Sequence, residues 1–397
     1  MSRYLFPFRL PLSAALCVCL AASGLPQTTT SAKAGTDQDA AGDAPENPGP
    51  LATGLSPRLD PKDIKRAMRM VADWELSTAE ATFNQQWTYA ALYDGLIAAT
   101  KTTHDPRYAD AVERAAADKF HWQLLDTRFP HADDEALGQA YLDLYRMHPD
   151  PVRMANTREI MDRLVARPDD PHKLLWWWCD ALFMAPPVLV RMYAITQDRK
   201  YLDFMDHEWW LTSAVLYDPN EHLFFRDERY LAQKEENGQP LFWARGNGWV
   251  LAGLANVLQF MPNDYPTRAR YVAQFQSMAA RIAGVQQPDG LWKTGLLDPG
   301  AYQNSEVSGT AFFTFAMAWG IDHGLLDPKV FRPVVERAWA GMLTHIYANG
   351  RLGAIQRIGS APNSVPPSSS YVYGVGGFLL AGSEVIQLGR HSASTRH

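Results

Sequence analysis

Cysteine is scarce in this sequence, and that scarcity limits what can hold the fold together. Only three of the 397 residues are cysteine, and two of them lie within the first 24 residues. Removal of that segment leaves Cys179 alone, and a lone cysteine forms no internal disulfide. The mature chain must therefore be stabilised by packing, for which a hydrophobic content of 47% is ample.

An excess of basic residues is also missing. The chain has 37 Lys and Arg against 43 Asp and Glu, which gives a formal net charge of −6. No global positive field draws it to nucleic acid or to an anionic membrane, so we expect neither partner and expect a local site to hold any anionic ligand. After residue 24 no apolar run reaches the roughly 18 to 20 residues that a membrane span requires, which predicts no transmembrane helix.

The first 24 residues have the pattern of a secretory signal. Two arginines precede an apolar run over 10–20, and small residues follow at 21–24. This pattern predicts a signal peptide over 1–24 and export to the periplasm or the outside of the cell. A lipid anchor on Cys17 or Cys19 is the less favoured alternative, because no small residue directly precedes either cysteine.

Composition divides the rest of the chain. Residues 25–57 hold almost no large apolar side chain, so burial cannot offset chain entropy and we expect a disordered linker. Asp60 followed by Pro61 is a favourable N-cap and first-turn pair, which predicts the start of one ordered domain over 58–390. The last residues, 391–397, are expected to form a disordered tail.

The ordered region repeats one theme, a short polar or Gly-rich segment followed directly by a strongly apolar helix. Successive segments lie roughly 45 to 65 residues apart, the length of a helical hairpin with its loops, and such a period indicates a repeat architecture. These polar segments are 84–87, 131–134, 178–180, 245–249, 305–309 and 371–374.

Amphipathic helices are expected between the polar segments, for example over 106–124, 198–210 and 266–285. Alternation of apolar and amphipathic helices in six pairs predicts an all-α fold, an (α/α)6 barrel or six-hairpin toroid with the apolar helices inside. Short strand signals at 223–226 and 291–293 predict small hairpins in connecting loops. Polar segments that enter the inner helices would all converge on one mouth of such a barrel.

Asp180 is the only ionisable side chain in the apolar stretch 174–184. Desolvation there is expected to raise its pKa, because burial penalises the charged form, and general-acid catalysis needs a carboxylic acid that still carries its proton. The alternative is that Asp180 only caps the helix that follows. We favour the catalytic role, since an unpaired buried aspartate is rare.

Asp133 and Asp134 form a second acidic cluster, one polar segment earlier. Asp134 is the candidate for a partner carboxylate that positions water, and Asp133 is a candidate contact to the substrate. Aspartate in front of Glu135 also fits a helix N-cap, so this alternative stays open for both residues.

The segment 245–249 is the most informative one. Arg245 offers a planar fork for a carboxylate, two glycines let the backbone approach a ligand, and Trp249 offers a stacking face. Asn247 is a candidate polar contact, with helix capping as its alternative role. These residue types together favour the binding of an anionic sugar.

Three further residues complete the candidate sugar-binding set. Arg226 is a second arginine for a carboxylate, and pairing with Asp227 or Glu228 is the alternative. Trp87 and Trp178 lie in polar segments, and their indoles suit stacking against sugar rings.

Other chemistries find no support in the sequence. The 11 histidines form no His-Glu-x-x-His spacing, no Gly-Lys-Ser/Thr phosphate loop occurs, and Cys179 has no adjacent base. We therefore expect neither a metal nor a cofactor.

Four segments strongly resemble glycoside hydrolase family 105, the unsaturated rhamnogalacturonyl hydrolases, which are related to the unsaturated glucuronyl hydrolases. The likeness runs from about Asp60 to Leu388. Its motifs occur in this order: 178–184 (WCDALFM), 243–249 (WARGNGW), 305–311 (SEVSGTA) and 373–379 (YGVGGFL).

This resemblance implies an (α/α)6 barrel that removes the 4,5-unsaturated uronic acid left by polysaccharide lyases at a non-reducing end. The chemistry it implies is hydration of a vinyl ether. Asp180 matches the general acid/base, which protonates C4 and then helps water to add at C5. Asp134 matches the position of the family's second essential aspartate, and its neighbour Asp133 is the alternative match. Arg245 and Trp249 match residues that contact the unsaturated sugar in the family. Some family members carry a histidine in the loop near positions 222–226. In this chain residues 223–226 are Leu-Phe-Phe-Arg and His222 lies just before them, so the resemblance leaves the choice of substrate open.

Rival functions remain at this point. A sugar epimerase or an inverting glycosidase fits the same barrel, and a non-catalytic oligosaccharide-binding protein would use the aromatics without a poised acid. The expected partner in each case is an oligosaccharide, and we expect a monomer.

Overall fold

The structure is a computed structural model and describes residues 41–168, 170 and 173–394. The predicted signal peptide, residues 25–40 of the predicted linker and residues 395–397 lie outside the described residues.

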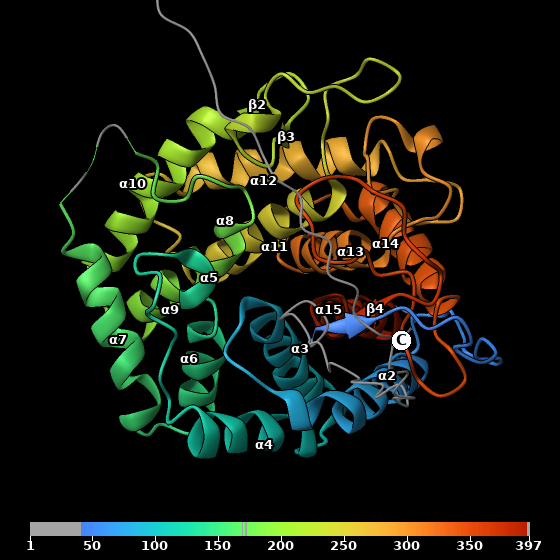
Figure 1. The fold of residues 1–397 in the computed structure, drawn as a ribbon, viewed down its shortest axis with the longest axis horizontal. Coiled ribbons are helices and arrows are strands. Elements are labelled where there is room, and N and C mark those ends of the chain that lie inside the picture. The colour runs from blue at the N-terminus through green and yellow to red at the C-terminus, as the bar shows by residue number, and fades with distance from the viewer. Residues whose placement is uncertain (1–40, 169, 171–172, 395–397) are drawn as a thin grey trace, which may run out of the picture. The chain divides into compact units, whose positions relative to one another are not determined.

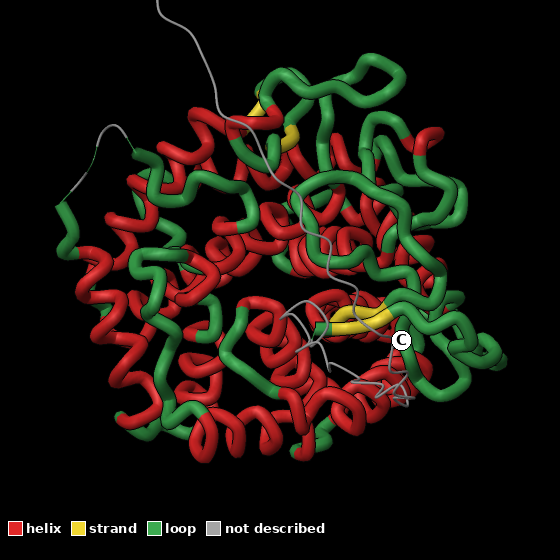
Figure 2. Tube along the Cα trace, in the orientation of Figure 1, coloured by secondary structure: helices red, strands yellow, loops and turns green. Residues whose placement is uncertain are grey.

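Within the described residues the chain is almost entirely helical (Figure 2). One set of helices is formed by α2 (Pro61–Ala79), α4 (Arg107–Arg114), α7 (Val152–Val165), α10 (Arg199–Leu216), α12 (Arg268–Ala283) and α14 (Pro328–Leu343). The helices that alternate with them are α3 (Trp87–Thr103), α6 (Gly138–Met147) after the short α5 (Ala132–Glu135), α9 (Pro186–Thr196) after the short α8 (Ala181–Met184), α11 (Ala244–Phe260), α13 (Val307–Asp322) and α15 (Val372–Ser394). Short turns of other helix types cover Glu80–Thr82, Ala115–Lys119, Glu228–Tyr230 and Pro299–Ala301.

The alternating helices form two concentric rings in the described part of the chain (Figure 1). In the inner ring α3 contacts α6, α6 contacts α9, and the sequence of contacts continues through α11, α13 and α15 back to α3. Each outer helix packs beside the inner helix next to it in the chain, as α2 does with α3 and α14 with α13. The prediction of an (α/α)6 barrel is confirmed.

The two rings differ because their helices bury different fractions of their surface. The inner helix α13 buries every residue from Val307 to Gly320, whereas the outer helix α2 buries mainly one face with Ile64, Met68 and Val71. A helix that is apolar all round must lie in a core, and an amphipathic one covers it. The inner helix α15 is apolar and long enough over 372–389 to cross a membrane, but 78% of that stretch is buried in the fold.

The predicted start of the domain is confirmed. The Asp60 side chain accepts a hydrogen bond from the Lys62 backbone N–H at 2.8 Å, and Pro61 is the first residue of α2. The predicted hairpin near 223–226 is confirmed too, as β2 (Tyr217–Asp218) paired with β3 (Leu223–Phe224). The second predicted hairpin is wrong, because Trp292 makes only an isolated bridge to Glu306.

Residues 41–57 correct the prediction of a disordered linker over 25–57. The strand β1 (Gly42–Asp43) pairs antiparallel with β4 (Ser370–Tyr371), and Ala41 is completely buried. Further along, the Ala52 N–H donates to the Ile346 carbonyl at 2.8 Å. Composition failed here because backbone pairing anchors a segment without large apolar side chains. The predicted tail over 391–397 is also corrected in part, since α15 continues to Ser394.

The closure between α3 and α15 depends on two glycines and gives a stability prediction. A Cβ on Gly376 would lie 2.1 Å from the Ala91 carbonyl oxygen, and one on Gly95 would lie 2.6 Å from the Gly376 carbonyl oxygen. We expect Gly376→Ala to lower the free energy of unfolding by about 1–3 kcal/mol or more, because the backbones must separate. Urea unfolding measures this.

The matched control for that measurement is Gly284→Ala at the end of α12, where a Cβ meets nothing closer than 3.4 Å. Equal effects of the two substitutions would contradict the packing argument.

Candidate active site

The polar segments meet at the N-terminal ends of the inner helices, as predicted. The inner helices, with the short α5 and α8 that precede α6 and α9, begin at or beside these segments, at Trp87, Ala132, Ala181, Ala244, Val307 and Val372. Because helix N-termini carry partial positive charge, this end of the barrel favours an anionic ligand.

Asp180 lies at the N-cap position of α8, but its side chain makes no capping hydrogen bond. The alternative role as a helix cap is therefore wrong. The carboxylate Oδ2 lies 3.5 Å from Arg226 Nε, and it accepts a weak hydrogen bond from the Cys179 thiol at 3.6 Å. Burial raises the pKa of Asp180 above its usual range, while Arg226 and then Arg245 oppose that rise. Asp180 is thus a buried carboxyl group on which two arginine side chains act through their charge.

Asp133 and Asp134 differ in what they face. Asp134 is buried and tied to Arg128, whose Nε donates to Oδ1 at 2.9 Å and whose backbone N–H donates to Oδ2 at 3.2 Å. The pKa of Asp133 is raised to about 7, mainly by burial; Arg128 opposes this rise and the negative charge of Asp180 contributes to it. Neither aspartate is the N-cap of α5, which is His131. The electrostatic partner of Asp180 in this structure is therefore Asp133, and Asp134 anchors the preceding loop.

Arg245 corrects the expectation of a fork presented to a ligand. Its Nη1 donates to the Gln356 backbone carbonyl at 2.8 Å, and its Nη2 donates to the Arg357 carbonyl at 3.0 Å. The guanidinium also lies over the rings of Trp243 and Tyr373, at 4.4 Å and 4.9 Å from their centroids. Both terminal nitrogens of the guanidinium are thus bound by the loop between α14 and α15. Arg245 acts on Asp180 through its charge.

Asn247 also differs from the prediction of a substrate contact. Its side-chain oxygen accepts from the Phe224 N–H at 2.7 Å, and its amide nitrogen donates to the carbonyls of Phe224 and Trp243 at 3.0 Å and 3.1 Å. The residue is completely buried. It joins the β3 hairpin to α11, and so positions the neighbouring Arg226.

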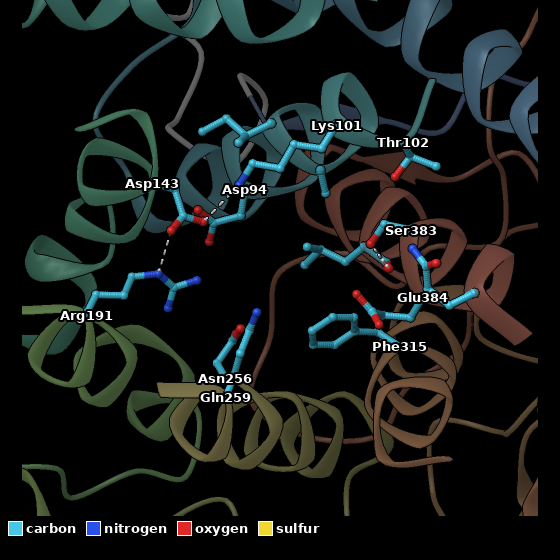
Figure 3. Close-up of a pocket in the computed structure, with 14 residues that line it drawn as sticks. Asp94, Lys101, Thr102, Asp143, Arg191, Asn256, Gln259, Phe315, Ser383 and Glu384 are labelled. Carbon is cyan, nitrogen blue, oxygen red and sulfur yellow. Dashed lines mark hydrogen bonds and ion pairs between the residues drawn. The ribbon is translucent and has the colours of Figure 1, made fainter. Parts of the chain in front are cut away.

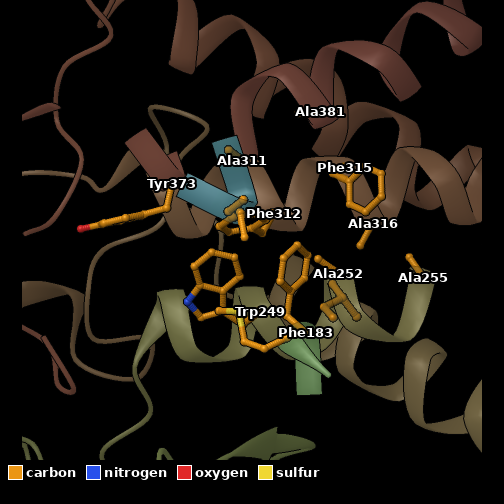
Figure 4. Close-up of a cluster of buried hydrophobic side chains, with 14 of the residues drawn as sticks. Phe183, Trp249, Ala252, Ala255, Ala311, Phe312, Phe315, Ala316, Tyr373 and Ala381 are labelled. Carbon is orange, nitrogen blue, oxygen red and sulfur yellow. The ribbon is translucent and has the colours of Figure 1, made fainter. Parts of the chain in front are cut away.

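Trp249 is completely buried and presents no open face for stacking. Its indole packs against Phe312 and Phe183, with ring centroids 4.1 Å and 4.7 Å away (Figure 4). Trp87, partly buried, lies 6.0 Å from Trp249 edge-on and stacks on Tyr373 at 5.4 Å. Stacking of a sugar on Trp87 stays a prediction. Trp249 packs against Trp87 from the buried side and supports its position.

Arg226 makes the internal pair that was its alternative role, and its binding of a substrate carboxylate stays a prediction. Its Nη1 donates to Asp227 Oδ2 at 2.6 Å, so the internal pair exists, while its Nε faces Asp180. Trp178 differs from the expectation of an open stacking face. Trp178 is buried against His131 and Trp177, at 4.8 Å and 4.7 Å between ring centroids, so it offers little open surface.

Three functional candidates were missed by the sequence analysis. Gln356 accepts from Trp243 Nε1 at 2.7 Å and from Arg245, and nothing in its surroundings in the sequence signals that role. Tyr373 lies in a polar segment and donates its hydroxyl to the Gln356 carbonyl. Trp177 lies next to Trp178 in the run of three tryptophans, and 42% of its surface is exposed. The run itself was the available signal for Trp177.

A separate cavity of about 250 Å³ lies towards the C-terminal ends of the inner helices (Figure 3). Asp143 pairs there with Arg191 at 3.1 Å and with Lys101 at 3.9 Å, and burial raises the pKa of Asp94 to about 8. None of the predicted site residues lines this cavity. Its polar groups lie apart from the Asp180 cluster.

Comparisons with known proteins agree with this arrangement. The family model described as Glycosyl Hydrolase Family 88 matches residues 62–389. An unsaturated 3S-rhamnoglycuronyl hydrolase of Formosa agariphila is 40% identical over 351 residues, which cover 83% of this chain and 92% of that protein. A protein of the same name from an Alteromonas species is 34% identical, over 76% of this chain and 77% of its own length.

Solved structures show the same fold. A glycosyl hydrolase family 88 protein from Bacteroides vulgatus superposes with a TM-score of 0.78 and 32% identity, over 82% of this chain and 99% of that one. A Salmonella enterica protein, described as a possible member of the GH105 family, has a TM-score of 0.70 at 18% identity, over 85% and 96% of the two chains. At that identity the likeness concerns the fold alone.

The raised pKa of Asp133 gives a prediction for stability against pH. A folded pKa of about 7 against 3.8 means that its stability contribution is intact below pH 3.8 and is lost as pH rises through 7. We expect Asp133→Asn to be more stable than the parent near pH 8, on the order of a few kcal/mol, and similar to it near pH 4. Thermal unfolding at the two pH values measures this. A stability difference that did not depend on pH would contradict the raised pKa.

Proposed function

The chain belongs to glycosyl hydrolase family 88, and we propose that this glycoside hydrolase releases a 4,5-unsaturated uronic acid from the non-reducing end of lyase-generated oligosaccharides. Asp180 is the observation that carries the proposal. It is a buried carboxyl group with a raised pKa that caps no helix and lies beside two arginines. A carboxyl group whose pKa is raised by burial keeps its proton to a higher pH than a free aspartate does, and it can give that proton to a bound substrate.

The proposed reaction is hydration of the vinyl ether. Asp180 transfers its proton to C4, the C4=C5 double bond is consumed, and positive charge develops on C5 and the ring oxygen. Water then adds at C5 and gives its proton to the Asp180 carboxylate, which restores the acid. The hemiketal at C5 opens by breaking its bond to the ring oxygen, and the resulting hemiacetal at C1 expels the remaining sugar.

Buried donors around Asp180 support binding of the uronate carboxylate. Among the described residues, Arg226 Nε and Arg245 Nε are buried and have no hydrogen-bond partner, and both arginines act on Asp180 through their charge. Unsatisfied buried donors are rare in folded proteins, and an anionic ligand is the kind of group that satisfies them. The charges of Arg226 and Arg245 also stabilise the Asp180 carboxylate that forms after proton transfer.

Asp133 is proposed as the second carboxyl group of the reaction, in place of Asp134. The negative charge of Asp180 helps to raise the pKa of Asp133, so the two carboxyl groups interact and resist simultaneous ionisation. Once Asp180 has given up its proton, Asp133 can orient the attacking water.

The relatives narrow the proposed substrate class. Those from Formosa agariphila and Alteromonas are named unsaturated 3S-rhamnoglycuronyl hydrolases. We infer that the sugar next to the unsaturated uronic acid is a rhamnose here too. Export through the signal pattern of residues 1–24 and a monomeric state are also proposed, the first from the arginines and apolar run of that segment.

Trapping with methanol distinguishes vinyl-ether hydration from displacement at C1. Loss of the ultraviolet absorbance of the conjugated double bond follows the reaction. With methanol in the buffer, addition at C5 gives a methyl ketal at C5, which mass spectrometry and NMR identify. A methyl glycoside at C1 would instead show an ordinary glycosidase, and binding without loss of absorbance would show a non-catalytic binder.

Substitution of Asp180 tests the proton donor. We expect Asp180→Asn to lower kcat by about 10² to 10⁴, the usual contribution of a general acid, because the amide keeps the shape and lacks the acidic proton. The variant should keep the circular dichroism spectrum of the parent. Turnover close to that of the parent would exclude Asp180 as the acid.

The pH dependence of the parent enzyme follows from the same group. Because the reacting form of Asp180 is protonated, kcat/KM should be constant below its pKa and fall as pH rises through it. A kcat/KM that rises with pH over that range would assign Asp180 the role of a base in the first step.

A further inference from the structure

The cavity at the C-terminal ends of the inner helices is separate from the site around Asp180 (Figure 3). Its volume of about 250 Å³ lies just below the range of ordinary small-molecule pockets. Its lining residues come from α3, α6, α9, α11, α13 and α15, so all six inner helices contribute to it. Since Asp180 lies where the inner helices begin, the cavity occupies the opposite end of the barrel.

Two buried polar side chains from different helices face this cavity. Asp94 on α3 is only 8% exposed, and its Oδ1 is buried without a hydrogen-bond partner among the described residues. Asn256 on α11 is 5% exposed and points into the cavity from another wall (Figure 3). Unsatisfied buried polar atoms are rare in folded proteins, and a bound ligand is one way to satisfy them.

The cations of the cavity are largely occupied by the protein. Arg191 Nε donates to Asp143 Oδ1 at 3.1 Å, and its Nη1 donates to the Gln139 side chain and the Pro187 carbonyl, both at 3.2 Å. Lys101 lies 3.9 Å from the other oxygen of Asp143, and half of its side chain is exposed at the rim. An anionic ligand therefore finds no free guanidinium fork here.

A cationic ligand is not favoured either. The pKa of Asp94 is raised to about 8, mainly by burial; Arg191 opposes this rise and Asp143 contributes to it. The pKa of Glu384 is raised to about 7, again mainly by burial. Near neutral pH Asp94 is thus mostly uncharged, while Arg191 and Lys101 repel a cation.

The uncharged groups that remain are suited to hydroxyl groups. A protonated carboxyl group has one O–H donor and a carbonyl acceptor, and the amide of Asn256 likewise donates and accepts. A hydroxyl group also does both, so it can satisfy either partner. Ile97, Phe315 and Leu380 line the same cavity and offer apolar surface for the C–H face of a sugar ring.

We propose that this cavity binds one neutral, polyhydroxylated molecule of monosaccharide size. Asp94 and Asn256 exchange hydrogen bonds with its hydroxyl groups, and the Phe315 ring packs against its apolar face. The inference does not depend on the proposed function, because the proposed reaction takes place at the other end of the barrel.

Calorimetry and saturation-transfer NMR on the whole chain test the ligand class. The hydroxyl probes are glucose, xylose and rhamnose, and the charged probes are acetate and methylammonium. We expect a Kd on the order of 1 mM for at least one sugar, in line with the affinity per atom of small ligands, and no saturable binding of the charged probes. Binding of a charged probe without a sugar would overturn the ligand class. No saturable binding of any probe would overturn the site.

Substitutions in the cavity place the bound sugar. We expect Asp94→Leu and Asn256→Leu each to weaken binding about tenfold or more, because each removes a donor and an acceptor from the site. Asp94→Asn keeps both groups and should stay within about threefold of the parent. Two separate leucine variants guard against the misfolding of one, which circular dichroism detects. Unchanged affinity in both folded leucine variants would overturn the proposal.

The matched control is Trp87→Ala at the opposite end of the barrel, where a sugar could bind as substrate or product. We expect this variant to bind the probes as the parent does. Loss of binding in Trp87→Ala, with full binding in the two leucine variants, would place the sugar at the substrate end and overturn the proposal. An equal loss in all three variants would also overturn it, since binding would then not be specific to this cavity.

Discussion

Closure of the inner ring is the constraint on which the rest of the structure depends. The first and last inner helices, α3 and α15, approach so closely that Gly95 and Gly376 leave no room for a Cβ. Inner and outer helices alternate along the chain and run in opposite directions, so every inner helix begins at the same end of the barrel. Polar segments that the chain spaces far apart therefore act on one substrate, and the positive ends of the helix dipoles add to the field there.

At this end of the barrel the carboxyl group of Asp180 is buried. Burial favours the protonated form of Asp180, and the nearby charges of Arg226 and Arg245 favour the ionised form. These opposing effects suit a group that must lose a proton to carbon and regain it from water within one cycle. The charge of Asp180 in turn helps to raise the pKa of Asp133, so ionisation of both carboxyl groups together is unfavourable.

Much of the site is built from residues that support others. Asn247 fastens the β3 hairpin to α11, and Gln356 accepts from both Trp243 and Arg245. Glu306, at the start of α13, accepts a hydrogen bond from the Gln356 N–H at 3.0 Å. The loop between α14 and α15, which carries Gln356, is therefore connected to α13 as well as to Arg245 of α11. The guanidinium of Arg245 is held by carbonyl groups from more than a hundred residues away in the chain. Such a network fixes the positions of charges around Asp180 with little side-chain freedom.

The sequence by itself determined the ring of paired helices, the start at Asp60 and the choice of Asp180, because these follow from hydrophobic period, local capping and the presence of one acid in an apolar stretch. Only the tertiary structure decided which neighbours use each polar atom. It gave the fork of Arg245 to a distant loop, tied Asp134 to Arg128 while the charge of Asp180 acts on Asp133, and left Trp177 exposed instead of Trp178. The physical reason is that hydrogen-bond partners and exposed faces depend on segments remote in the chain, which no local pattern records.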